Sequence, residues 1–253
     1  MTRIIMHGCN GKMGQVITGI CRNDENIEIV AGIDIADSIP TNGYPVYTDI
    51  DSCKEKADAV IDFSSARAVD KLLDYCVRRN LPLVLCTTGL SEEQISKVKE
   101  ASGKIAILRS ANMSLGINML LKELKSITGI LAPAGFDIEI VEKHHNQKID
   151  APSGTALALA DSINEGLNYD YVFDRSQVRK KRSKNEIGIS AVRGGNIVGE
   201  HEVIYAGPDE VITITHTAYS KALFGNGAVQ AAKFLAGKPA GMYNMVDVID
   251  NML

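Results

Sequence analysis

Tryptophan is absent from this sequence of 253 residues, and aromatic residues make up only 5% of it. The core must therefore consist mainly of aliphatic side chains, which the sequence supplies, since hydrophobic residues make up 45% of the chain. Charged residues make up 23%, and both fractions are ordinary for a globular protein. A chain of this length forms one large domain or two modest ones and needs no disulfide to stabilise its core.

Cysteines are few, and their pattern shows no pairing. The five of them contain no C-x-x-C spacing and lie at Cys9, Cys21, Cys53, Cys76 and Cys86. This odd count excludes a disulfide framework and a cysteine-based zinc site, and we predict no bound metal. Unpaired thiols suit a reducing compartment. The sequence leaves open whether Cys9 is reactive or simply a small buried residue.

Long apolar runs are also missing. No uninterrupted run approaches the roughly 20 residues that a membrane-spanning helix needs. The first residues, Thr2–Gly8, lack the apolar core of a signal peptide. We therefore expect a cytoplasmic protein without a membrane partner.

A strong excess of charge of one sign is absent as well, since the net charge is −4 with histidine neutral. This value gives no global attraction to nucleic acid or to anionic membranes. The exception is a short basic run, Arg179–Arg182 with Lys184. We interpret it as a solvated loop, because nucleic-acid binding needs a wider basic face with interleaved aromatics.

Apolar strand-like segments alternate with helical ones in the first 112 residues. Such alternation is typical of a parallel sheet with helices on both faces. We therefore predict an α/β fold with a Rossmann-type doubly wound parallel sheet. Its strands are predicted at Ile4–Met6, Ile27–Ile33, Val46–Thr48, Ala59–Phe63, Leu81–Leu85 and Lys104–Leu108, and its helices at Lys12–Arg22, at Ala68–Arg79 and from Ser91.

The pattern changes after residue 112. Helices at Asn118–Ile130 and Thr155–Leu167 flank a strand at Asp137–Lys143, and β-rich segments with Gly-Gly and Gly-Pro turns follow to Tyr219. We predict a second, α+β domain over residues 113–220 with mainly antiparallel strands. The tail, 221–253, contains a helix at Gly227–Ala236 and is predicted to return to the first domain.

A glycine-rich loop follows the first strand. Gly8, Gly11 and Gly14 permit a tight turn and close backbone approach to a pyrophosphate, and the next helix offers free N–H groups to the anion. Asn10 holds the position of the second glycine of the G-x-G-x-x-G pattern. An ordinary strand–turn–helix is therefore the alternative interpretation.

Asp34 ends the second strand, twenty residues after Gly14. A carboxylate there accepts hydrogen bonds from the adenosine ribose and opposes a 2′-phosphate, which favours NADH. The next residue is Ile35 and not an arginine that could bind a phosphate. An exposed turn aspartate is the alternative.

Groups that can exchange protons or bind anions cluster at residues 142–156. Histidine titrates near neutral pH, and lysine supplies a positive charge, so His144, His145 and Lys148 suit acid–base work on an anion. Ser153, Gly154 and Thr155 then open a helix whose N–H groups can bind a carboxylate. Two adjacent histidines are also often structural or bind metal, but no cysteine or further histidine lies at ligand spacing.

This segment, E-x-H-H-x-x-K-x-D-A-P-S-G-T-A, resembles the signature of the 4-hydroxy-tetrahydrodipicolinate reductases, also called dihydrodipicolinate reductases. Further segments resemble that family in the same order along the whole chain: 8–14, 86–89, 111–118, 193–201 and 224–228. The resemblance implies NAD(P)H-dependent reduction in lysine and diaminopimelate biosynthesis. It also implies a nucleotide domain of residues 1–112 and 221–253, and a substrate domain of residues 113–220 that builds a homotetramer.

The resemblance also implies roles for single residues. His144 would be the general acid/base and Lys148 the second proton donor. His145, Ser153, Gly154 and Thr155 would bind the carboxylates of a small dicarboxylate substrate. The cofactor would contact Gly8, Cys9, Asn10, Gly11, Lys12, Met13, Asp34, Cys86, Thr87, Thr88, Ala111, Asn112, Met113, Ser114, Lys221 and Phe224.

The chain departs from the family pattern where the cofactor would bind. Cys86 replaces a glycine and Met113 a phenylalanine, and Ser65 stands where members often carry an arginine. Since Ile35 also removes a phosphate partner, we expect NADH to be preferred or equal. NADPH would then depend on Lys12 or Lys221.

Two other functions remain as alternatives. Another two-domain oxidoreductase, such as a diaminopimelate or aspartate dehydrogenase, would need the glycine-rich loop but not the His-His-x-x-Lys segment. A non-catalytic nucleotide sensor could dispense with His144 and Lys148, and both are present.

Overall fold

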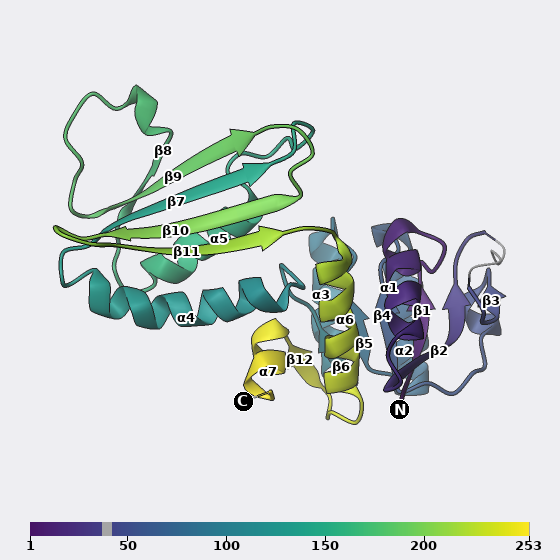
Figure 1. The fold of residues 1–253 in the computed structure, drawn as a ribbon. Helices are drawn as coiled ribbons and strands as arrows, with labels where there is room; N and C mark the ends of the chain where they lie inside the picture. Colours follow the sequence, from purple (N-terminus) through teal and green to yellow (C-terminus); the bar gives the residue numbers. More distant parts are fainter. Residues whose placement is uncertain (37–41, 253) are drawn as a thin grey trace. The chain divides into compact units, whose positions relative to one another are not determined.

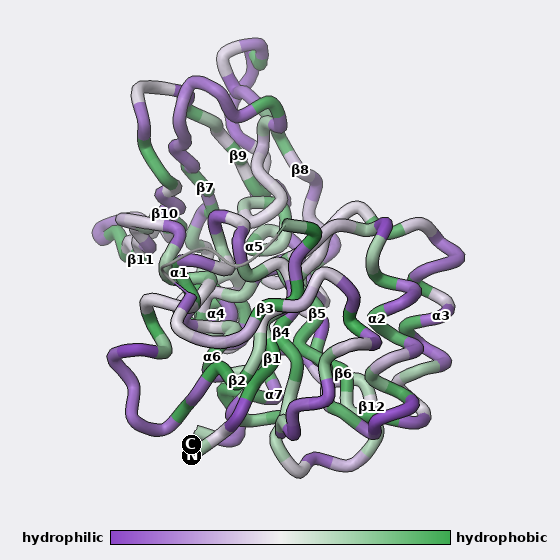
Figure 2. Tube along the Cα trace, turned by 90° about the vertical axis from the view of Figure 1, so that its right-hand side faces the viewer, coloured by the Kyte–Doolittle hydropathy of each residue, from purple (hydrophilic) through white to green (hydrophobic). Residues whose placement is uncertain are grey.

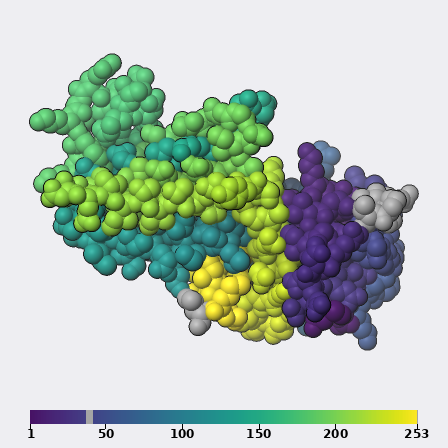
Figure 3. All heavy atoms as spheres, in the orientation of Figure 1, coloured from purple at the N-terminus to yellow at the C-terminus, as the bar shows by residue number. Residues whose placement is uncertain are grey.

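The structure, a computed structural model, describes residues 1–36 and 42–252. The chain divides into two compact units (Figure 1). The first contains Met1–Leu115 and Ala222–Leu253, and the second contains Gly116–Lys221. In Figure 3 the yellow-green segment of the first unit lies against the purple N-terminal part of the chain, where α6 contacts α1, so the segment after residue 221 completes the first unit.

The first unit is built on a parallel sheet whose described strands follow the order β12-β6-β5-β4-β1-β2-β3. The chain winds outward from β1 to one side and then starts again with β4 on its other side, so the strand order reverses between these two neighbours. In doubly wound folds, ligands bind beyond the carboxyl ends of the strands at this switch point. The strands are β1 (Thr2–His7), β2 (Ile27–Ile33), β3 (Val46–Tyr47), β4 (Ala59–Asp62), β5 (Leu83–Leu85), β6 (Ala106–Leu108) and β12 (Gly241–Tyr243).

Helices cover both faces of this sheet because alternate strand residues point to opposite sides. Ile4 and Met6 of β1 pack in one cluster with α1, α6 and α7, whereas Ile5 packs in the other with α2 and α3. In Figure 2 the hydrophobic, green segments run through the strands between the two helical layers. The helices are α1 (Lys12–Arg22), α2 (Ala66–Arg79), α3 (Glu92–Ser102), α6 (Ala222–Leu235) and α7 (Met245–Asp250).

The second unit contains a mixed sheet in the order β11-β10-β7-β9-β8, with helices α4 and α5 packed on one face. Strand β7 alternates half-buried and buried residues, so Glu142 and His144 point to the same buried side as Ile138 and Ile140. The elements are α4 (Leu115–Leu131), β7 (Asp137–His144), α5 (Gly154–Asn164), β8 (Asp170–Phe173), β9 (Glu186–Arg193), β10 (Gly199–Ala206) and β11 (Val211–Ala218).

The α/β and α+β fold classes predicted from the sequence are confirmed, but the prediction of mainly antiparallel strands in the second unit is wrong for half of its sheet. Strand β10 runs antiparallel to both β7 and β11, whereas β9 runs parallel to both β7 and β8. The connection from β7 to β9 passes through α5, and such a crossover brings the next strand back in the same direction.

The basic run is more ordered than we expected for a solvated loop. Arg182 donates hydrogen bonds to the carboxylates of Asp137 and Glu139 and to the backbone carbonyls of Ile138 and Glu186. This arginine therefore fixes the loop to the start of β7 and β9. Across 1–36 and 42–252, no helix is both long and apolar enough to cross a bilayer.

Candidate active site

The glycine-rich loop connects β1 to α1 in a conformation that requires glycine at two positions. Gly8 has φ +81°, and a Cβ on it would lie 2.6 Å from the carbonyl oxygen of Phe63. A Cβ on Gly14 would lie 2.3 Å from the carbonyl oxygen of Gly8. The N-cap residue of α1, Gly11, offers no side-chain hydrogen bond. The helix N–H groups and dipole are therefore presented toward the loop, as a pyrophosphate site requires.

Asn10 explains why this loop does not need glycine at its second position. The backbone N–H of Asn10 donates to Oδ2 of Asp34 over 2.9 Å, and its side-chain oxygen accepts from Nδ2 of Asn42 over 2.8 Å. The asparagine therefore ties the loop to the end of β2. Asp34 lies where the sequence predicted it, directly after that strand.

A cavity of about 620 Å³ opens beside this loop, entirely within the first unit. Its walls include Gly8, Asn10, Gly11 and Asp34, together with residues from the start of α2. Two of these are cations that sequence analysis missed, Arg67 and Lys71. The ammonium of Lys71 pairs with Asp49 over 2.6 Å and with Asp51 over 3.5 Å, whereas Arg67 has no ion pair among the described residues.

His7 and Asp62 form a second feature of this cavity that the sequence did not reveal. His7 lines the cavity, and its Nδ1 lies 2.7 Å from Oδ1 of Asp62, a fully buried carboxylate. The two residues end the adjacent parallel strands β1 and β4. They therefore hold the two sides of the switch point together.

The remaining predicted cofactor residues of the first unit follow β5 and β6 or lie on α6. Because parallel strands end at one edge of a sheet, the loops carrying Thr87 and Met113 emerge at the same edge as Gly8. Oγ1 of Thr87 is buried and has no hydrogen-bond partner within the described part of the chain. Residues of these two loops and of α6 are Cys86, Thr87, Thr88, Ala111, Asn112, Met113, Ser114 and Phe224. Lys221 is assigned to the second unit, although we expected it in the nucleotide domain.

Cys9 behaves as a buried structural thiol. Its side chain is fully buried, and burial together with the nearby carboxylate of Asp34 raises the pKa of Cys9 to about 11. Since the thiolate is the reactive form, this cysteine stays protonated and inert at neutral pH. It fills the space beneath Gly32, where a Cβ would lie only 2.6 Å from Sγ of Cys9.

In the second unit, the predicted acid/base His144 is fixed by a carboxylate two residues before it. Nδ1 of His144 lies 2.6 Å from Oε2 of Glu142. Arg193 of β9 donates to both oxygens of Glu142, over 2.8 and 2.7 Å. The pairing of β7 with β9 places His144 directly opposite Arg193, so sheet register creates this arrangement.

His201 of β10 completes the surroundings of His144. The two imidazole rings meet edge to face with centroids 5.1 Å apart. Burial lowers the pKa of His201 to about 4, so its ring is neutral at physiological pH. Nε2 of His201 lies 3.1 Å from Oγ of Ser153. This second ring therefore packs against His144 without adding a charge.

Ser153 has protein partners for its side chain and its backbone N–H. Oγ accepts from the N–H of Ala156, as an N-cap does, and the N–H of Ser153 donates to Oε1 of Glu142 over 3.0 Å. Ser153 is 2% exposed, whereas Gly154 is exposed and Thr155 is half-buried. Gly154 and Thr155 are therefore the first residues of α5 that are not fully buried.

Lys148 and His145 lie on the turn between β7 and α5. The N–H of Lys148 donates to the carbonyl of His145, and Nζ of Lys148 pairs with Asp150 over 2.7 Å. The side chain of Lys148 is 22% exposed. The turn thus presents a cation, an imidazole and a helix N-terminus together, the groups that a carboxylate binds.

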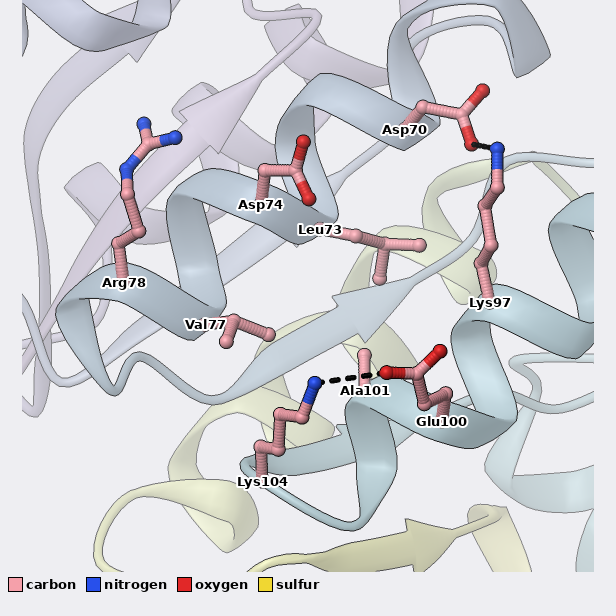
Figure 4. A pocket seen from close by; sticks show the side chains of 9 residues that line it. All are labelled: Asp70, Leu73, Asp74, Val77, Arg78, Lys97, Glu100, Ala101 and Lys104. Atoms are coloured by element: carbon pink, nitrogen blue, oxygen red, sulfur yellow. Dashed lines mark hydrogen bonds and ion pairs between the residues drawn. The ribbon is translucent and has the colours of Figure 1, made fainter.

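Other candidate sites on the described residues are weak. No group of three or more histidine, cysteine or acidic side chains in 1–36 and 42–252 could hold a metal ion. A second cavity, of about 430 Å³, lies between α2 and α3 (Figure 4). Four of its charged groups pair with each other, Lys97 with Asp70 and Lys104 with Glu100, and none of the predicted site residues lines it.

Comparison with known proteins gives a consistent result. Family models described as dihydrodipicolinate reductase, N-terminus and C-terminus, match residues 2–113 and 116–249. A 4-hydroxy-tetrahydrodipicolinate reductase from Caldanaerobacter subterraneus subsp. tengcongensis is 53% identical over 98% of each chain. One from Clostridium tetani is 51% identical over 97% of this chain and 96% of the relative. The solved structure of a dipicolinate-bound dihydrodipicolinate reductase from Paenisporosarcina sp. TG-14 covers 100% of both chains with a TM-score of 0.81 and 24% identity, which shows a shared fold.

Proposed function

The chain belongs to the dihydrodipicolinate reductase family, and from this membership we propose that it reduces 4-hydroxy-tetrahydrodipicolinate to tetrahydrodipicolinate with a nicotinamide cofactor. The protein is thus an oxidoreductase of lysine and diaminopimelate biosynthesis. The observation that carries the proposal is the pair of His144, held by Glu142, and Lys148 on the turn that opens α5. Neither alternative considered above, a different dehydrogenase or a nucleotide sensor, requires that cluster.

The residues of the first unit fit a nicotinamide dinucleotide. The backbone of Gly8–Gly14 and the start of α1 would hold the pyrophosphate, and Asp34 would accept from the adenosine ribose. Thr87 brings an unpartnered buried hydroxyl to the same sheet edge. When bound, the cofactor supplies the hydride, and the protein positions the cofactor against the substrate and polarises the reacting groups.

The residues of the second unit would bind and protonate the substrate. The ammonium of Lys148, the ring of His145 and the start of α5 at Gly154 and Thr155 would bind its two carboxylates. Ser153 would act indirectly, by capping α5 and so fixing the start of that helix. His144 would move protons as water leaves the ring, and Lys148 would supply the proton that accompanies the hydride.

Lys148 allows a direct test of this assignment. Lys148→Ala should lower kcat/KM by roughly tenfold or more, since a charge-assisted hydrogen bond is worth about 1.5–3 kcal/mol. The matched control is Lys143→Ala, a lysine of β7 whose ammonium pairs with Glu200. The control should keep wild-type kinetics in the same assay. Nearly intact hydride transfer in Lys148→Ala would remove Lys148 from the mechanism.

The cavity walls support use of both cofactors with NADH preferred or equal. Asp34 favours the free ribose, while Arg67 supplies a cation without an ion pair among the described residues, in the same cavity, for a 2′-phosphate. Arg67 is therefore a third candidate beside Lys12 and Lys221. Lys71 is a poorer candidate, because two aspartates already neutralise it.

A coupled assay tests activity and cofactor use together. The preceding synthase would condense pyruvate and aspartate semialdehyde in situ, and oxidation of NADH and NADPH would be followed separately. We expect synthase-dependent oxidation with NADH at least as fast as NADPH, and a selective loss of NADPH use in Arg67→Ala. Folded protein that oxidises neither cofactor would contradict the proposed function, whereas a clear NADPH preference would contradict only the role of Asp34.

We further propose a cytoplasmic homotetramer assembled through the second unit, with no nucleic-acid or membrane partner. Support comes from the family, from the unpaired cysteines and from the absence of a strong charge excess. Sedimentation equilibrium of the full chain distinguishes a tetramer from a monomer or dimer.

A further inference from the structure

Glu142 is a buried carboxylate in which each oxygen has two hydrogen-bond partners. Oε1 accepts from the Ser153 N–H and from one guanidinium nitrogen of Arg193, and Oε2 accepts from the other guanidinium nitrogen and faces Nδ1 of His144. The Glu142 side chain has no exposed surface. Every partner but one, the imidazole, is a group that can only donate.

The surroundings keep this carboxylate charged. Burial alone would raise the pKa of Glu142, but hydrogen bonds from Arg193, His144 and the Ser153 N–H hold it below its ordinary value. The guanidinium of Arg193 also donates to the carbonyl of Asp150. Glu142 therefore presents a fixed negative charge to His144 throughout the neutral pH range.

A charged carboxylate determines which nitrogen of His144 carries the proton. Nδ1 must donate to Oε2, so the neutral ring bears its proton on Nδ1 and leaves Nε2 to accept or release one. No side chain covers the Nε2 side from position 199, because that residue is a glycine whose Cβ would lie 3.1 Å from Nε2. The structure thus gives Nδ1 a carboxylate partner and leaves space for another group beside Nε2 at position 199.

The other charged or titratable groups around His144 do not compete for its Nδ1. His201 packs edge to face, and its Nε2 is engaged with Ser153. The ammonium of Lys148 pairs with Asp150. Glu142 is accordingly the group within hydrogen-bond distance of Nδ1.

We propose that Glu142 is a positioning residue, held by Arg193, that keeps His144 in the tautomer in which Nε2 exchanges protons with the substrate. This inference rests on the proposed function for its catalytic consequence but not for the tautomer itself. If the ion pair between Glu142 and Arg193 were purely structural, it would stabilise the pairing of β7 with β9, and the neutral ring of His144 could carry its proton on either nitrogen.

Glu142→Gln separates these two possibilities because the new amide must place an NH₂ group on one side. The Ser153 N–H cannot become an acceptor, whereas His144 can, by moving its proton to Nε2. The amide nitrogen should therefore face His144 and reverse its tautomer. Arg193 loses one acceptor in either orientation, so it does not decide the outcome.

The experiment combines ¹⁵N NMR of the histidine rings with steady-state kinetics. His144 is assigned among the five histidines by comparison with a His144→Gln sample. We expect the neutral wild-type ring to be protonated on Nδ1, Glu142→Gln to be protonated on Nε2, and kcat to fall by roughly tenfold or more with KM less affected. Glu142→Asp, which keeps the charge, should retain the Nδ1 proton and recover part of kcat.

Glu139→Gln is the matched control, since Glu139 lies on the same strand and pairs with Arg182 over 3.0 Å without touching His144. It should leave the His144 tautomer and kcat unchanged. An unaltered His144 tautomer in Glu142→Gln would overturn the proposal. An equal fall of kcat in Glu142→Gln and Glu139→Gln would also overturn it. If Glu142→Gln fails to fold, a change of tautomer in Glu142→Asp would overturn it instead. Wild-type protein that reduces no substrate would contradict the proposed function, while the tautomer measurement would still decide the role of Glu142.

Discussion

Replacing His144 with glutamine should lower kcat by roughly 10²–10⁴-fold, the usual contribution of a positioned general acid or base. Glutamine can donate its amide N–H to Glu142 in place of Nδ1, so the buried carboxylate keeps its partners. The variant therefore removes proton transfer with little change in packing. Cofactor affinity should be unchanged, because the glycine-rich loop and the cavity beside it belong to the first unit.

The measurement is kcat in the coupled assay together with NADH affinity by fluorescence titration. His216→Gln is the control, a histidine of β11 two strands from β7 in the same sheet. It should keep wild-type kcat. If His144→Gln retains most of its activity, another group must move the proton, and Lys148 would be the first to examine.

Local sequence signals predicted much of the first unit, because its strands are short apolar segments and its helices are amphipathic. The predicted limits of α1 and β2 coincide with the observed ones, Lys12–Arg22 and Ile27–Ile33. Strand β12 was missed, since Gly241–Tyr243 is too short to show a period. It is a strand only because β6 lies beside it.

The long-range contacts of the candidate site could not be predicted, since they depend on pairings between distant segments. Glu142 and Arg193 lie 51 positions apart, and Ser153 and His201 lie 48 apart. The register of β7 against β9 and β10 brings them together. A shift by one residue would turn every side chain of a strand to the opposite face, so register decides whether Glu142 meets Arg193, whereas the contact between Glu142 and His144 is local to β7.

The cavity of the first unit shows the same limit for the cofactor. Gly8, Gly11 and Asp34 were identified from the sequence and line the cavity, whereas Arg67 lies on α2 and reaches the cavity because β4 adjoins β1. The sequence motif includes only the glycine-rich loop and the helix that follows it. The opposite wall of the cavity, which contains Arg67, depends on the strand order.

Gly14→Ala should weaken NADH binding by roughly a hundredfold, because its new methyl group would lie 2.3 Å from the carbonyl oxygen of Gly8 and 2.5 Å from that of Cys9. Both carbonyl oxygens belong to the backbone of the glycine-rich loop, so the clash can be removed only if the loop or the start of α1 moves. Overpacking of this kind costs about 1–3 kcal/mol, and here the displaced groups are the ones that would bind the pyrophosphate.

Gly19→Ala provides a matched control in the same helix. A Cβ at Gly19 has no neighbouring atom within 4 Å, so alanine adds no clash. It should raise the free energy of unfolding by roughly 1 kcal/mol, the difference in helix propensity between the two residues, and leave NADH affinity unchanged. Fluorescence titration and urea unfolding of both variants would separate these effects. Wild-type affinity in Gly14→Ala would show that the loop tolerates a side chain there, whereas an equal loss in both variants would show that affinity depends on α1 as a whole and not on the close approach at Gly14.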